Sequence, residues 1–187
     1  MIRLPVAGKD QVGTPVRGHL MDKQPMDLDT YSANAQRPGC FVCAFLAGDP
    51  EYRHEVVFED EDHVAFLDRW PTLPGKLLVC PRRHLEHVVR DFTEAAYLRM
   101  MLVVRRVALA AEDVLGAERT YLMSMGSQQG NAHLHWHVAC LPPGVPYLEQ
   151  QFEALRFENG VLTPSEAETA DLAERLRTAI AARAALD

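Results

Sequence analysis

The sequence has 187 residues, of which 48% are hydrophobic, and a formal net charge of −7 with its eight histidines neutral. This length suits one globular domain, and the negative charge offers no basic surface to a nucleic-acid polymer. No apolar run approaches the roughly 18 residues of a membrane span, and the N-terminus lacks the apolar region of a signal peptide. We therefore expect a soluble cytoplasmic protein, where cysteines are metal ligands or redox groups more often than disulfides.

Proline and glycine divide the first half of the chain. Residues 1–37 mix them with scattered charge and show no sustained period, so we expect a poorly ordered tail there. Three strands are expected next, over residues 55–59, 63–68 and 76–81. The third is a nearly continuous apolar run that ends at a proline, which indicates a buried strand.

Helical signals follow these strands. Thr93 is a plausible N-cap and Gly116 a helix end, and apolar residues recur between them at helical spacing, which predicts one long helix. Two more strands are expected at residues 119–125 and 133–141, on either side of a polar, glycine-rich loop. Ser165 is placed to cap a last helix with one apolar stripe.

This order of elements predicts an α+β fold. The expected domain, residues 38–145, is a five-stranded antiparallel sheet with the long helix packed against it, and residues 146–187 form a C-terminal helical extension. Apolar residues spread around more than one side of the long helix, which favours a homodimer. They are Met100, Met101, Val103, Val104, Val107 and Leu109.

Three histidines alternate with apolar residues in the last predicted strand. Side chains two apart share one face of a strand, so His133, His135 and His137 line one surface while the residues between them point into the core. The Cα atoms of His133 and His137 would lie about 13 Å apart, too far for all three to share one metal easily. At least one histidine therefore serves another purpose, and the amide-rich loop before the strand suits an anion.

The segment His-Leu-His-Trp-His-Val-Ala resembles the signature of the histidine triad (HIT) superfamily. Upstream, residues 57–68 and 74–84 are similar to the strand–strand–loop–strand segment of that superfamily. Residues 74–81 most resemble the fragile-histidine-triad branch, whereas the Cys-x-x-Cys at residues 40–43 and the Pro-x-x-His at 81–84 look like the nucleotide-binding phosphoramidase branch. The resemblance covers about residues 40–142 and implies a HIT-like fold.

The resemblance also implies a chemistry. His135 would attack the α-phosphorus of a purine nucleotide conjugate, a dinucleoside polyphosphate or a nucleoside phosphoramidate, and form a covalent nucleotidyl-histidine. His137 would contact the phosphate or the leaving group, and Asp68 would hold the ribose hydroxyls. Gln129 and Asn131 are placed as phosphate ligands by position only. The apolar walls around the base would be Val57, Phe58, Phe66 and Leu67.

Cys40 and Cys43 have the spacing of metal ligands, but such a pair needs two further ligands. The resemblance implies a structural zinc held by Cys40, Cys43, His84 and His133, with His87 as a rival fourth ligand. Two reduced thiols near the start of the domain are the alternative. Cys80 and Cys140 lie in apolar strands and are expected in the core.

Two other functions remain open from the sequence. One is a non-catalytic module that binds a purine nucleotide, and the other is a metal-dependent hydrolase that uses the histidine strand. The remaining histidines, His19, His54 and His63, are given no role.

Overall fold

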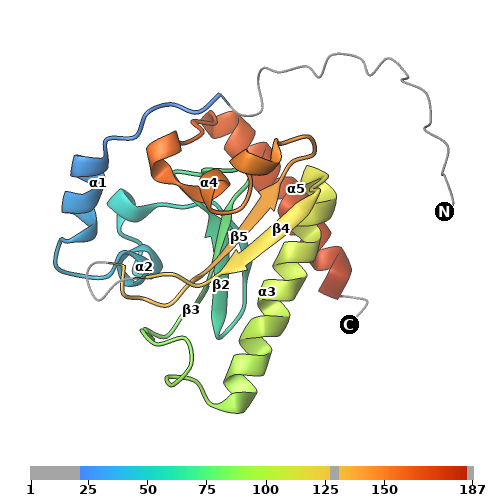
Figure 1. Ribbon diagram of the computed structural model, residues 1–187. Helices are drawn as coiled ribbons and strands as arrows, with labels where there is room; N and C mark the ends of the chain where they lie inside the picture. Colours follow the sequence, from blue (N-terminus) through green and yellow to red (C-terminus); the bar gives the residue numbers. More distant parts are fainter. Residues whose placement is uncertain (1–21, 127–130, 185–187) are drawn as a thin grey trace, which may run out of the picture.

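The sheet has five strands, and every neighbouring pair is antiparallel. The computed structural model describes residues 22–126 and 131–184. Its strands are β1 (Val56–Glu59), β2 (His63–Leu67), β3 (Leu77–Pro81), β4 (Arg119–Met123) and β5 (Trp136–Leu141), in the order β1-β2-β3-β5-β4. The expected α+β fold is thus confirmed (Figure 1).

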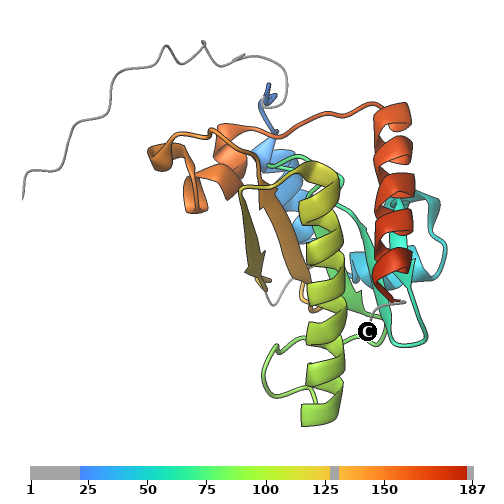
Figure 2. The same cartoon turned by 90° about the vertical axis from the view of Figure 1, so that its right-hand side faces the viewer.

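Two long helices cover one face of this sheet. α3 (Glu94–Leu115) is capped at its start by Thr93, whose side chain accepts a backbone hydrogen bond, and at its end by Gly116 in the left-handed conformation. α5 (Glu166–Ala184) lies beside α3 (Figure 2), and its Leu176 and Ile180 are buried in the core that both helices share with the sheet. None of the helices in the described residues is long and apolar enough to cross a membrane.

Shorter elements cover the other face. α2 (Phe41–Leu46) packs Val42 against Val64 and Leu78 of the sheet, and α4 (Phe152–Leu155) packs Ala154 against Leu141. The short 3-10 turns are η1 (Pro50–Tyr52), η2 (Tyr147–Glu149) and η3 (Phe157–Asn159). Because both faces are covered, every residue of β3 is buried.

Part of the expected poorly ordered tail is ordered, which corrects that expectation for residues 22–37. α1 (Leu28–Ala35) is capped by Asp27, whose carboxylate accepts the Thr30 N–H. Ahead of it, Gln24 exchanges backbone hydrogen bonds of 2.8 and 2.9 Å with Val161. Composition did not reveal this order because its partner lies far along the chain. Residues 1–21 lie outside the described residues.

The fifth strand begins three residues later than expected, at Trp136. Before it, the Leu134 N–H donates to the Leu85 carbonyl oxygen at 2.6 Å and makes no ladder bond. The predicted alternation still holds, because Leu134, Trp136 and Val138 are buried in the core against α3. The histidines between them therefore face away from α3.

Gly75 and Gly116 form a matched pair for testing how tightly this core is packed. Both have left-handed φ, 61° and 63°, but a Cβ at Gly75 would lie 2.9 Å from a Leu115 methyl carbon, whereas at Gly116 it would meet open space. We expect Gly75→Ala to lower the free energy of unfolding by about 2–3 kcal/mol and Gly116→Ala by only about 1 kcal/mol. Chemical denaturation measures both, and equal losses would contradict the packing argument.

Candidate functional site

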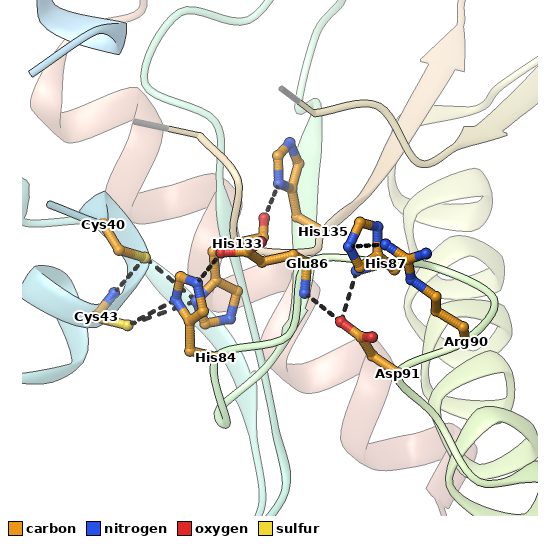
Figure 3. Close-up of polar contacts among 9 residues, drawn as sticks. All are labelled: Cys40, Cys43, His84, Glu86, His87, Arg90, Asp91, His133 and His135. Atoms are coloured by element: carbon orange, nitrogen blue, oxygen red, sulfur yellow. Dashed lines mark hydrogen bonds and ion pairs between the residues drawn. The ribbon is translucent and has the colours of Figure 1, made fainter. Parts of the chain in front are cut away.

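Four side chains with sulfur or nitrogen donors meet beside the sheet. Cys40 and Cys43 lie at the start of α2, His84 in the loop after β3, and His133 just before β5, and their donor atoms all lie within 4.8 Å of one another (Figure 3). The His133 Nδ1 is 3.3 Å from the Cys40 Sγ and 3.7 Å from the Cys43 Sγ. The His84 Nδ1 is 3.4 Å from the Cys43 Sγ.

The second nitrogen of each imidazole in this cluster is already bound. The His133 Nε2 donates to the Pro81 carbonyl oxygen at 2.8 Å, and the His84 Nε2 donates to the Glu86 carboxylate at 3.2 Å. Since these oxygens only accept, the ring protons lie on Nε2 and the Nδ1 lone pairs face the cysteines. Histidines that ligate metals are commonly oriented by such outer acceptors.

The donor set fits a structural zinc. Zinc binds sulfur at about 2.3 Å and nitrogen at about 2.0 Å, so neighbouring donors of a tetrahedral site lie roughly 3.5 Å apart. The sulfur–nitrogen distances of 3.3, 3.4 and 3.7 Å agree with that spacing. His87 lies outside the cluster, because its ring contacts Arg90 and its backbone N–H donates to Asp91 (Figure 3).

His135 is buried and held in one tautomer. Its Nδ1 lies 2.7 Å from the His133 carbonyl oxygen, which can only accept, so Nδ1 carries the proton and Nε2 the lone pair. Burial is the main cause of a lowered pKa for His135, which keeps the ring neutral at pH 7. A neutral imidazole with a free Nε2 is a nucleophile.

His137 and a buried ion pair lie next to this ring. The rings of His135 and His137 meet edge to face with centroids 4.8 Å apart. Burial, and then the positive charge of Lys76, lower the pKa of His137 to about 3. The Lys76 Nζ is 2.9 Å from an oxygen of Asp68. Burial alone would raise the pKa of Asp68, but the Lys76 ammonium, its hydrogen bond and the Trp70 N–H hold it below its usual value.

A cavity of about 490 Å³ opens over this group. His135, His137, Asp68 and Lys76 line it, and so does Asn131 from the predicted phosphate loop. Aromatic rings line two parts of it. Phe41 and His54 line the first part, and Phe45 and Phe66 pack against the His54 ring from behind. The second part is lined by Tyr31, Trp70 and Phe157.

Some predicted wall residues are not brought to this cavity. Val57, Phe58 and Leu67 pack on the α3 side of the sheet, the opposite face, which corrects their expected role as base walls. Phe66, the neighbour of Leu67, lies on the cavity side because strand residues alternate, but it is fully buried behind His54. Gln129 lies outside the described residues.

Several residues of the site were missed from the sequence, among them Lys76 and His54. Lys76 starts an apolar strand, and nothing in its local pattern distinguishes a buried ammonium from an exposed one. His54 was given no role, yet its ring stands 4.5 Å from the Phe66 ring, lines the cavity and has a pKa lowered mainly by burial. Its place depends on α2 folding over β2, which no local signal predicts.

Comparison with known proteins decides the family. The model of the HIT domain matches residues 49–141. An uncharacterized HIT-like protein of Saccharolobus solfataricus is 30% identical over 105 residues, which are 55% of this chain and 73% of that relative. The chain belongs to the histidine triad (HIT) family. A zinc-bound histidine triad family protein from Mycobacterium smegmatis has a similar structure, with a TM-score of 0.62 and 25% identity over 79% of this chain and 97% of that one.

Two further HIT relatives carry the names of activities. A bis(5′-adenosyl)-triphosphatase of Dictyostelium discoideum is 28% identical over 89 residues, 47% of this chain and 59% of the relative. An adenosine 5′-monophosphoramidase of Danio rerio is 31% identical over 101 residues, 53% of this chain and 62% of the relative. The HIT family thus includes enzymes named for nucleotide conjugates of both kinds that the sequence left open.

The donor cluster predicts a metal content. The purified HIT protein should contain about one zinc per chain by elemental analysis, and Cys40→Ser or Cys43→Ser should lose it. Cys140→Ser is the matched control, because that thiol is buried in β5 away from the cluster. Chelation should lower the unfolding midpoint by roughly 10 °C, equivalent to about 3 kcal/mol. Zinc retained after loss of either ligand would contradict the assignment.

The lowered pKa of His137 predicts a dependence of stability on pH. In the unfolded chain, the His137 ring binds a proton below about pH 6.5. In the folded chain, the same ring stays neutral down to about pH 3. Unfolding is therefore favoured as the pH falls through this window, with a slope of up to about 1.4 kcal/mol per pH unit from this group. Denaturation of His137→Asn between pH 7 and 4 should show a shallower loss than the native protein. A parallel loss in both would refute the neutral, buried state.

Proposed function

We propose that this HIT protein is a nucleotidyl hydrolase or transferase that attacks the α-phosphorus of a purine nucleotide conjugate with His135. The observation that carries the proposal is the 2.7 Å hydrogen bond from the His135 Nδ1 to the His133 carbonyl oxygen. This hydrogen bond leaves the lone pair on the Nε2 of His135. His135 lines a cavity that is large enough for a nucleotide. The named activities of the two HIT relatives support the substrate class.

The proposed reaction has two steps at one phosphorus. In the first, the Nε2 lone pair of His135 forms a P–N bond, and the bond from phosphorus to the leaving group breaks with its electron pair on the leaving group. In the second, water attacks the phosphorus, the P–N bond breaks, and the electron pair returns to Nε2. Overall, water supplies a hydroxyl to phosphorus and a proton to the leaving group.

The neighbouring groups have supporting roles in this proposal. His137 stays neutral, so its ring N–H can donate to a phosphoryl oxygen. Asp68 keeps its charge, and an acceptor beside the cavity suits the ribose hydroxyls. Asn131 lines the cavity from the loop side, where an amide can bind a phosphate oxygen. Zinc, when bound, would hold His133 in place. The carbonyl group of His133 would then keep His135 in its tautomer.

A metal-dependent hydrolase that uses all three histidines has less support. The His133 Nδ1 faces the two cysteines, whereas the His135 Nδ1 is hydrogen-bonded to a carbonyl oxygen. Among the described residues, the potential metal cluster contains His133 but neither of the other two. A non-catalytic nucleotide-binding module uses the same cavity, so it is separated from an enzyme by experiment.

Loss of the nucleophile tests the proposal. His135→Asn should lower kcat/KM for adenosine 5′-phosphoramidate or a diadenosine polyphosphate by about a thousandfold or more, with an unchanged unfolding midpoint. Mass spectrometry of acid-quenched native protein should show a nucleotidyl adduct on His135. His63→Asn is the matched control, because that histidine binds Asp60 at the far end of β2. Binding without product in the native protein would support the non-catalytic module instead.

We propose a homodimer that forms through the apolar residues of α3 that stay exposed in the single chain. Met100, Val103, Val104 and Val107, which favoured it in the sequence, are buried within this chain. Leu98 and Leu102 of α3 remain 57% and 61% exposed, and they offer an apolar stripe to a second copy. Light scattering of the native protein should give twice the chain mass.

The cytoplasmic location remains a prediction.

A further inference from the structure

The cavity has an outer wall built from both ends of the chain. Tyr31 comes from α1 and Phe157 from η3, and both lie outside residues 49–141, which the HIT domain model matches. Their rings pack together with centroids 5.1 Å apart, and the Tyr31 ring also meets Trp70 edge to face at 5.8 Å. We call Tyr31, Trp70 and Phe157 the aromatic wall.

Specific contacts hold two segments against each other, residues 22–37 and residues 146–162, which we call the two extensions. Gln24 pairs with Val161 through two backbone hydrogen bonds, and the Lys23 Nζ donates to the Ala154 carbonyl oxygen at 3.3 Å. Gly160 permits the close approach, since a Cβ there would lie 2.7 Å from the Gln24 carbonyl oxygen. The Leu162 N–H also donates to the Pro71 carbonyl oxygen, next to Trp70, at 2.8 Å. The wall is therefore fixed at several points.

Charge around the wall suits a nucleotide. Three cationic side chains, Arg37, Arg69 and Lys76, line the cavity with two anionic ones, Glu51 and Asp68, in a chain whose net charge is −7. Arg69 stands over the Trp70 ring and Lys76 over the Phe157 ring, each 5.2 Å from the ring centroid. Rings backed by cations form a surface that attracts a flat, electron-rich ring joined to an anion.

We propose that the two extensions complete the nucleoside pocket, and that the aromatic wall binds the base of the nucleotide. This inference rests on the proposed function, because it takes the nucleotide as the ligand of the cavity. The Tyr31 hydroxyl is protonated and its ring uncharged at pH 7, and burial with the nearby Asp68 carboxylate raises the pKa of Tyr31 further. Two of the three rings of the wall, Tyr31 and Phe157, thus come from residues outside the region that the HIT domain model matches, and Trp70 comes from within it.

Binding of AMP and of ribose 5-phosphate tests this wall. In the full-length protein, Tyr31→Ala and Phe157→Ala should each weaken AMP binding about tenfold in calorimetry. The same variants should leave the binding of ribose 5-phosphate, which lacks the base, within about twofold. Tyr31→Phe should keep AMP affinity, because it keeps the ring. Tyr147→Ala and Phe152→Ala are matched controls, since both rings are exposed, at 74% and 77%, and do not line the cavity.

The outcomes separate this inference from the proposed function. Equal weakening of both ligands would show that the wall only supports the fold, and no weakening of either would show that the base binds elsewhere; both overturn the inference. If Tyr31→Ala unfolds α1, Phe157→Ala and Trp70→Ala test the same wall from other elements. Formation of the His135 adduct is measured on the native protein, so the failure of catalysis and the failure of the wall are seen in different experiments.

Discussion

One hydrogen bond, from the His135 ring to the His133 carbonyl oxygen, joins the two halves of the site. The His133 ring belongs to the cysteine–histidine cluster, while its backbone sets the tautomer of the next histidine on the same face. In the proposed reaction, a histidine whose ring could rotate or change tautomer would be in the reactive state for only part of the time. Here both freedoms are removed by a residue that is itself fixed by the Pro81 carbonyl oxygen and the two thiols.

The buried pair of Lys76 and Asp68 sets the electrostatics of the cavity. The ammonium helps to keep His137 neutral, and the carboxylate compensates the ammonium, so that little net charge is buried. Removing one partner of such a pair commonly costs about 3–5 kcal/mol, since the other charge is left alone. The Asp68 backbone N–H also donates to the Lys76 carbonyl oxygen at 2.9 Å, so main-chain contacts hold the two residues together as well.

Local patterns predicted the parts of this molecule that depend on neighbours in sequence. Thr93 and Gly116 bound the long helix because caps act within one turn, and alternation placed Leu134 and Trp136 in the core. The same alternation could not say which face of β2 meets the cavity, so Leu67 was assigned to the wrong side. Tyr31, His54 and Lys76 escaped notice because each acquires its role from segments that meet it only after folding. The cysteine–histidine set was predicted from spacing together with resemblance, since spacing alone supplied only two of its four members.

The contact between the two extensions also bears on when the cavity can form during synthesis. Lys23 and Ala154 are separated by 131 residues, and the Gln24–Val161 bridge spans a similar distance along the chain. Contacts of such high contact order form late, because a long loop must close before they contribute. On a ribosome, which delivers the chain from the N-terminus, all five strands have been synthesised before residue 161 emerges, and α5 follows later. The contacts that close this wall of the cavity therefore become possible only after every strand of the sheet, with His135 and His137, has been made.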